Sequence, residues 1–329
     1  ILKLRKTDSG EANTDRNRGE TLFASFPSTA VSTVKISGLD QSVTLTKKDG
    51  NWVVAERGNY PANKETLFSL LRTIEEVKIN NAIDAGPTFA KRFGIDLTAK
   101  TQAEHGTQLS FLNESQENIA TLFLGKESEG GGRFVQNAAD TSGYYVTSES
   151  FPSATADPKN WLNMDFLKVE KIKSIAVTSA GKPEQTEWKL SRSDENAEFT
   201  LDGASPTEKL DTNATTPLKT ILSAANFQDV ISGTDVATVE KAAERQVVTI
   251  DTTDGFRYLI TLVAKPAVQV PDALAKADES QAPPAEESYQ MTVKVTATFA
   301  KERCELATLR TWVSGHIFND TNNSLMNLM

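Results

Sequence analysis

The order of strand and helix signals in this chain occurs twice, in two stretches of comparable length. In the first stretch, short runs of alternating apolar and polar residues begin near Val31, and an amphipathic segment follows them. The second stretch opens near Val169 and repeats that order. Because an apolar stripe must be buried against another element, the sequence predicts an α+β protein of two tandem similar lobes, each an antiparallel sheet with one packed helix.

The first stretch indicates a meander of short strands followed by one helix. Lys48-Asp49-Gly50-Asn51 supplies turn chemistry between two strand runs. Tyr60-Pro61-Ala62 leads to Asn63, which is a good helix N-cap. The apolar positions after it share one face at the helical period, and they are Leu67, Leu70, Leu71, Ile74 and Val77.

The second stretch contains the same kinds of signal. Ser193-Asp194-Glu195-Asn196 reads as a turn between strands, and Thr253-Asp254-Gly255 is a strong hairpin signal. A helix is expected from Thr215 or Thr216 as cap, with Pro217 in its first turn. Its apolar face would consist of Leu218, Ile221, Leu222 and Ala225.

Further alternating runs follow each expected helix. In the first stretch they are centred on residues 109–111, 119–124, 134–135 and 144–146, and in the second on residues 247–250, 256–262 and 289–295. These runs complete the correspondence between the two stretches. The alternative is that any α+β chain of alternating hairpins yields such an alignment without a duplication.

The pattern divides the chain into four parts. Residues 1–30 are expected to form a tether, residues 31–168 the first repeat, residues 169–312 the second repeat, and residues 313–329 a C-terminal tail. The chain begins with Ile1 and continues with a polar Asp/Asn/Arg/Gly-rich stretch to Glu20, which is typical of a tether after a membrane anchor. An ordinary terminus is the alternative.

Composition limits the chemistry that the chain can carry. A formal net charge of −9 argues against binding nucleic acid or an anionic membrane nonspecifically. The single cysteine, Cys304, excludes an intramolecular disulfide, and the two histidines, His105 and His316, lie far apart in the sequence. No catalytic, cofactor-binding or metal-ligating residue is identified, so the chain is expected not to be an enzyme.

Several features resemble sites but have a simpler structural reading. Gly130-Gly131-Gly132, within residues 125–133, lacks the Lys-Ser/Thr ending of a phosphate-binding loop, so a hairpin connection is favoured. The Pro/Ala/Glu-rich residues 264–288 read as an insertion between two strands and as a weak candidate for partner contact. The remaining candidates are assigned to the core or to turns rather than to sugar or calcium binding, and they are Trp52, Trp161, Trp188, Trp312, Asp49, Asp194 and Asp254.

Short motifs give the chain a family resemblance over residues 31–235. They are Asp49-Gly50-Asn51-Trp52-Val53-Val54, Tyr60-Pro61-Ala62, Phe93-Gly94-Ile95-Asp96, Leu122-Phe123-Leu124-Gly125-Lys126 and Tyr144-Tyr145-Val146. With these motifs the chain resembles the bacterial family known as domain of unknown function 4340. The resemblance implies an envelope protein that follows one N-terminal membrane helix and accompanies ABC-type transport or gliding-associated membrane systems.

Residues and resemblance together predict a noncatalytic auxiliary or structural subunit of the bacterial cell envelope. It would lie on the periplasmic or extracytoplasmic side, held by an N-terminal anchor absent from this chain, and would dock on a membrane protein complex such as an ABC-type transport system. Sheet edges, the Pro/Ala/Glu-rich insertion and a cleft between the lobes are the expected contact surfaces. The alternative is a soluble protein that binds a glycan or small solute in that cleft.

Overall fold

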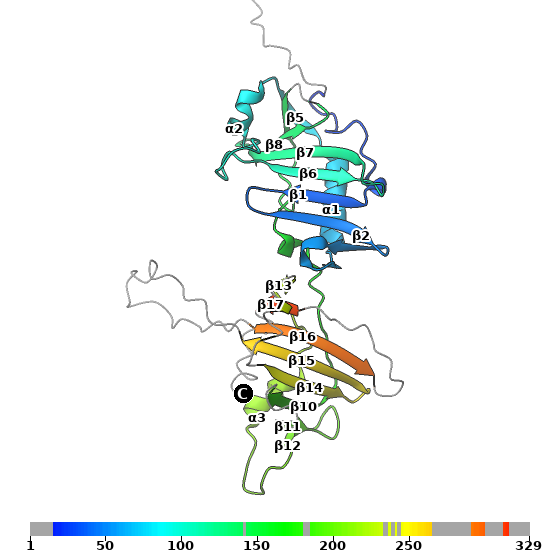
Figure 1. Cartoon of the computed structure of the whole chain (residues 1–329), viewed down its shortest axis with the longest axis vertical. Coiled ribbons are helices and arrows are strands. Elements are labelled where there is room, and N and C mark those ends of the chain that lie inside the picture. The colour runs from blue at the N-terminus through cyan, green and yellow to red at the C-terminus, as the bar shows by residue number, and fades with distance from the viewer. Residues whose placement is uncertain are drawn as a thin grey trace, which may run out of the picture. The chain divides into compact units, whose positions relative to one another are not determined.

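The protein is an α+β chain with more strand than helix, as seen in a computed structural model (Figure 1). The structure describes residues 16–140, 143–179, 185–232, 236–237, 241, 245–264, 291–299 and 312–315. The chain divides into two compact units, Ile1–Asn163 and Met164–Met329, and each unit contains one sheet. The predicted fold class is therefore confirmed at the level of α+β.

The described part of the first unit contains a nine-stranded antiparallel sheet. Its strands are β1 (Thr33–Ser37), β2 (Ser42–Lys48), β3 (Asn51–Val54), β4 (Tyr60–Pro61), β5 (Ile79–Ile83), β6 (Thr107–Leu112), β7 (Asn118–Glu127), β8 (Arg133–Asn137) and β9 (Tyr144–Thr147). They lie in the order β4-β3-β2-β1-β6-β7-β8-β9-β5. The helices are α1 (Lys64–Glu76) and α2 (Ala90–Phe93), with the 3-10 turns η1 (Ser28–Ala30), η2 (Ala55–Arg57), η3 (Pro87–Phe89) and η4 (Pro158–Trp161).

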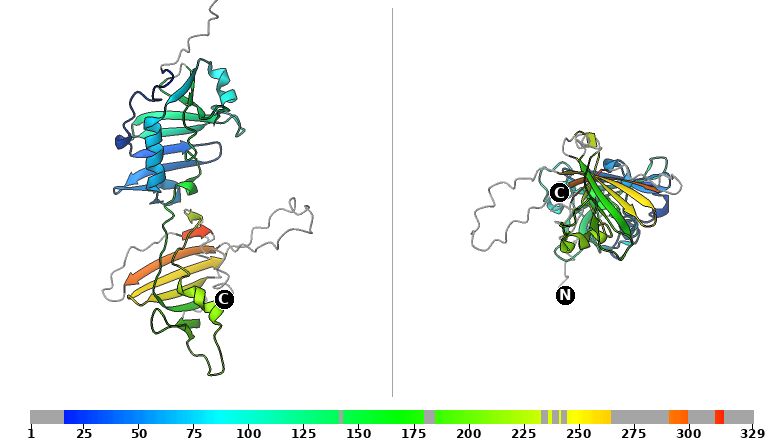
Figure 2. Two further views of the ribbon diagram at one scale, coloured as in Figure 1. Left: turned by 180° about the vertical axis from the view of Figure 1, so that it is seen from behind. Right: turned by 90° about the horizontal axis from the view of Figure 1, so that it is seen from below.

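Local sequence chemistry explains the meander and the helix of the first unit. Asp49 and Gly50 take positive φ angles of 50° and 77° between β2 and β3, as a two-residue hairpin turn requires. The Asn63 side chain accepts a hydrogen bond from the backbone N–H of Thr66 at 3.0 Å and caps α1, as predicted. Helix α1 crosses one face of the sheet (Figure 2) and buries its predicted apolar face there, namely Leu67, Leu70, Leu71 and Ile74.

The described part of the second unit contains an eight-stranded antiparallel sheet. Its strands are β10 (Ile172–Ser179), β11 (Thr186–Ser191), β12 (Thr200–Leu201), β13 (Asp229–Ile231), β14 (Gln246–Thr252), β15 (Phe256–Ala264), β16 (Met291–Phe299) and β17 (Trp312–Gly315). They lie in the order β12-β11-β10-β14-β15-β16-β17-β13. The helical segments are α3 (Thr212–Thr215) and the 3-10 turn η5 (Thr216–Lys219).

The two sheets follow the same strand order. In the first sheet β1 pairs with β2 and β6, and in the second sheet β10 pairs with β11 and β14. Along the chain, both β6 and β14 come after the helical segment of their unit and one further strand. That further strand, β5 or β13, lies at the far edge beside the last strand of its unit. Strand β4 alone has no counterpart among the described residues of the second unit.

The helix of the second unit differs from the prediction. Asp211, rather than Thr215 or Thr216, caps it by accepting from the backbone N–H of Asn213 at 2.8 Å, and the helical segment ends at Lys219 rather than near Ala225. Pro217 has no N–H group with which to continue the α-helical bonds, so the segment tightens into a 3-10 turn. Leu218, Leu222 and Ala225 are nevertheless buried.

The C-terminal part of the second unit was only partly foreseen. Strand β17 pairs with both β16 and β13, so residues 313–315 belong to this sheet and not to a separate tail. Residues 265–288 of the Pro/Ala/Glu-rich insertion lie outside the described residues, as do residues 289–290 of the last expected strand run.

Candidate functional site

The N-terminal part of the first unit pairs with the start of one edge strand of its sheet. Residues 16–22, here called the N-terminal strap, lie beside residues 77–79, where β5 begins. The N–H of Gly19 donates to the carbonyl of Ile79 at 2.8 Å, the N–H of Ile79 donates to Glu20 at 2.9 Å, and the N–H of Leu22 donates to Val77 at 2.9 Å. Two of these bonds occupy the N–H and C=O groups that Ile79, the first residue of the edge strand, otherwise offers to a partner.

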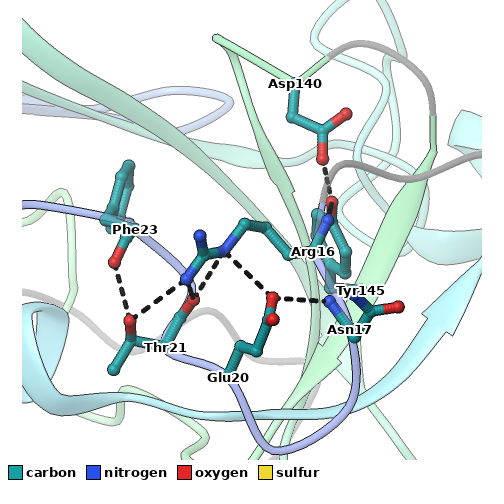
Figure 3. Close-up of polar contacts among 7 residues, drawn as sticks. All are labelled: Arg16, Asn17, Glu20, Thr21, Phe23, Asp140 and Tyr145. Carbon is teal, nitrogen blue, oxygen red and sulfur yellow. Dashed lines mark hydrogen bonds and ion pairs between the residues drawn. The ribbon is translucent and has the colours of Figure 1, made fainter.

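Side chains fasten the N-terminal strap to the unit (Figure 3). The guanidinium of Arg16 donates to the carbonyl of Thr21 at 3.1 and 2.9 Å and lies 3.6 Å from the Glu20 carboxylate. The backbone N–H of Arg16 donates to the hydroxyl of buried Tyr145 at 3.2 Å, and that hydroxyl donates to buried Asp140. A backbone hydrogen bond from Asn17, aided by the charge of Arg16, holds the pKa of Glu20 below its usual value.

The opposite edge of the first sheet is covered as well. The N–H of Asn63 donates to the carbonyl of Trp161 at 2.8 Å, and the N–H of Asn163 donates to the carbonyl of Pro61 at 2.9 Å. A bridge between Ala62 and Leu162 completes this pairing. The chain itself therefore pairs with the β4 edge and with the first residue of β5, whereas the use of sheet edges as contact surfaces stays a prediction.

The connection from β5 to β6 crosses the sheet. Since β5 lies at the edge beyond β9, the chain has to pass β9, β8 and β7 to reach β6. Residues 84–106, here called the crossover segment, make this passage and contain η3 and α2. Phe93 of α2 stacks on Phe134 of β8 with ring centroids 4.8 Å apart and lies 5.0 Å from Tyr144 of β9. Burial raises the pKa of Tyr144.

A glycine lets the crossover segment lie directly on β7. A Cβ atom at Gly125 would lie 2.1 Å from the carbonyl oxygen of Phe93 and 2.7 Å from Cγ1 of Ile95. Three motifs of the family resemblance, around Phe93, Gly125 and Tyr144, thus meet at this crossing. Their residue types are explained by close packing, so they carry no reactive group into a site.

The first sheet leaves part of its other face uncovered. In Figure 1, strands β1, β2 and β6 lie in front of α1. Along these strands, the residues that alternate with the core residues lie on the sheet face opposite the core. Thr33 and Thr46 share a hydrogen bond of 3.0 Å on this face. Exposed Lys35 lies between half-buried Thr44 and Ser110, so this part of the face carries hydroxyl groups and one positive charge.

The equivalent face of the second sheet carries charges. Lys189 Nζ lies 2.8 Å from Asp202 Oδ2, and Arg257 Nε lies 2.6 Å from Asp251 Oδ1. The hydroxyl of Ser174 donates to Asp251 at 3.2 Å. These side chains alternate along their strands with core residues such as Ile175, Leu190 and Ile250, so they lie on the face opposite the core.

The charges on this face are tuned by their neighbours. Burial alone raises the pKa of Asp251, but the hydrogen bond and charge of Arg257 outweigh burial and leave that pKa lowered. Hydrogen bonds from Lys189 and Ser191 lower the pKa of Asp202. The same pairing with Asp251 raises the pKa of Arg257. These groups are ionised at neutral pH, and they form an ion-pair network rather than an acid/base pair.

The aromatic candidates are assigned mainly to the core. Trp52 is 3% exposed and Trp161 is fully buried, so neither can stack on a sugar. Trp188 is half-buried on the core side of β11, where it pairs with Val177. Trp312 belongs to β17.

The polar candidates do not converge on a site. Asp194 accepts from the N–H groups of Asn196 and Ala197 at 2.9 and 3.1 Å, which confirms its turn role. The run Gly130–Gly132 connects β7 and β8, as predicted. His105 is half-buried, whereas Cys304 and His316 lie outside the described residues.

The described residues hold no cluster of three or more His, Cys, Asp or Glu side chains that could bind a metal ion. The same residues include no helix with the length and apolarity needed to span a membrane.

One comparison with known proteins gives a result. The model of the family described as domain of unknown function (DUF4340) matches residues 52–246, which is more than half of the 329 residues. No curated protein and no solved structure matches the chain. The match runs from β3 to the first residue of β14, so it covers α1, the crossover segment and the charged part of β11.

Proposed function

The chain belongs to the DUF4340 family, and from this premise we propose that it is a noncatalytic auxiliary subunit of the bacterial cell envelope that docks on a membrane protein complex. The proposal extends to an ABC-type transport system as the kind of partner and to an N-terminal anchor on the extracytoplasmic side. The shared strand order of the two sheets supports the further proposal that the units are tandem copies of one lobe.

One observation carries the proposal. Each sheet buries one face and leaves at least part of the other solvated, with hydroxyl or charged side chains on it. Because the chain itself pairs with β4 and with the first residue of β5, a partner of that unit is expected to meet the open face rather than these edges. Rigid sheet faces of this kind present a fixed pattern of polar groups and suit recognition of another protein.

The N-terminal strap supports the anchoring part of the proposal. It joins whatever precedes Arg16 to a buried point of the first unit, through the Tyr145 hydroxyl and the backbone bonds to β5. A tether that ends at this strap is therefore attached to a well-packed part of the first unit. This is what an anchored docking subunit requires.

The proposal is tested by photo-crosslinking in a native host. A photoreactive amino acid replaces Lys35 or Ser110 on the open face of the first sheet, and the matched control replaces exposed Arg72 on the outer side of α1. The expected result is a crosslink to a membrane protein from the two face positions and none from Arg72. Copurification from mild detergent extracts should then recover that membrane protein in fixed ratio. A chain that is recovered alone and gives no crosslink from the face contradicts the proposal.

A further inference from the structure

Four charged side chains form a band across the open face of the second sheet. They are Asp202 directly after β12, Lys189 on β11, Asp251 on β14 and Arg257 on β15, and they are here called the charge ladder. The strand order is β12-β11-β10-β14-β15, so β10 lies in the middle. Across the sheet, the signs are negative, positive, neutral, negative and positive.

The ladder is accessible, and small residues form its centre. The side chains of Lys189 and Asp202 are 45% and 38% exposed, and those of Arg257 and Asp251 are 57% and 30% exposed. Between the two halves, β10 places the small residues Ser174 and Ala176 on this face. Leu259, which follows Arg257 by two residues on β15, is 39% exposed on the same face. Small central residues and one exposed leucine allow another surface to approach closely.

The order of signs is complementary to itself. A rotation by 180° about an axis along β10 exchanges β11 with β14 and β12 with β15. It brings Lys189 close to Asp251 of a second copy and Arg257 close to Asp202 of that copy. The Lys189–Asp202 pair and the Asp251–Arg257 pair are offset from one another by two residues along β10. The long side chains of Lys189 and Arg257 can span this offset. Because the rotation repeats each contact, two kinds of ion pair occur twice in such an interface.

We propose that the charge ladder is the interface through which the second unit binds a second copy of this chain, face to face and with twofold symmetry. The ladder carries two positive and two negative charges, so a partner surface of one sign would meet as much repulsion as attraction. Each group already has one ion-pair partner within its own chain, and a partner surface with the reversed order of signs gives each of the four a second opposite charge; the same face of a second copy presents that order. The proposal rests on the proposed use of the sheet faces for docking and names the partner of one of them.

The association is expected to be weak and reversible. Each chain has a net charge of −9, so two copies repel one another at long range. At physiological ionic strength this repulsion is screened beyond about 8 Å, whereas close pairs are screened less. Exposed ion pairs contribute little each, so a dimer held by the ladder is visible only at high protein concentration.

Sedimentation analysis of the purified chain tests the proposal, at physiological ionic strength and between about 10 μM and about 1 mM protein. The wild-type chain should shift from monomer to dimer across this range. Arg257→Asp should raise the dimer dissociation constant at least about tenfold, because it places two like charges opposite each other twice. Lys168→Glu is the matched control, since it makes the same charge change in an ion pair with Glu170 that does not belong to the ladder.

A double variant separates contacts between copies from contacts within one chain. Arg257→Asp combined with Asp202→Arg restores the opposite-charge pair between copies. Within each chain, however, it places a carboxylate beside Asp251 and a guanidinium beside Lys189, so both internal ion pairs are lost. Recovery of the dimer by the double variant supports the proposal.

Two results overturn the proposal: a wild-type chain that stays monomeric throughout the concentration range, or a double variant that dimerises no better than the single one. Crosslinks from the first sheet to a membrane protein would in that case still stand. The two proposals therefore fail separately.

Discussion

Gly125→Ala is expected to destabilise the first unit by lifting the crossover segment from β7. The added Cβ would lie 2.1 Å from the Phe93 carbonyl oxygen, which is backbone and cannot move away without displacing α2. Overpacking of this kind costs about 1–3 kcal/mol. For a unit of this size each kcal/mol corresponds to about 2–4 °C in midpoint, so the variant should lose about 2–12 °C.

Calorimetry of the full chain measures this loss in the transition of the first unit. Hydrogen exchange locates it, because the N–H of Ile95 bonds to Ala90 at 2.8 Å and should lose protection, while amides in α1 should keep theirs. Gly130→Ala is the matched control, since a Cβ there meets nothing within 4 Å. Equal stability of the Gly125 and Gly130 variants would refute the argument that the crossover segment lies tightly on β7.

Three further changes test other parts of the structure. Tyr145→Phe removes a hydroxyl that bonds to Arg16 and Asp140, so it should cost about 1–3 kcal/mol and speed hydrogen exchange in the N-terminal strap; unchanged exchange there would contradict the fastening role. Asn63→Ala should cost about 1 kcal/mol in urea unfolding, whereas Asn63→Asp keeps the cap and should cost less. Asp251→Asn should lower the free energy of unfolding at pH 7. The pKa of Asp251 is lowered in the native state, so its carboxylate stabilises the fold at pH values above the usual aspartate pKa of about 3.9. That difference should vanish as the pH falls through the native pKa, and a deficit that persists in strong acid would contradict it.

Local signals predicted most of the strands and one helix correctly. Alternation of apolar and polar residues marked β1, β2, β6, β7 and β15, because one face of each strand packs on a core. The α1 prediction succeeded because its cap and its apolar stripe are both encoded within a few residues of one another. The second helix failed because the same apolar spacing is compatible with a 3-10 turn once Pro217 interrupts the bonds.

The contact surfaces could not be predicted in the same way. Sequence reasoning offered sheet edges, yet in the first sheet residues 161–163 pair with the β4 edge and residues 16–22 pair with the start of β5, and both segments lie far from their partners in the chain. The two short edge strands β5 and β13 were missed, since β5 carries Asn80 and Asn81 and β13 has only three residues. Gly125 gave a usable signal, because a glycine inside a strand marks close approach of another backbone.

The sequence by itself determined the strand periodicity, the capped helix α1, the hairpin turns and the family. Each of these depends on residues that are neighbours in the chain or on short motifs that can be read directly from the sequence. Only the tertiary structure decided which faces are covered, where the crossover segment lies and how Asp202, Lys189, Asp251 and Arg257 come to form one band. These features join residues tens of positions apart, and strand order in the sheet, which local chemistry does not encode, sets which of them become neighbours.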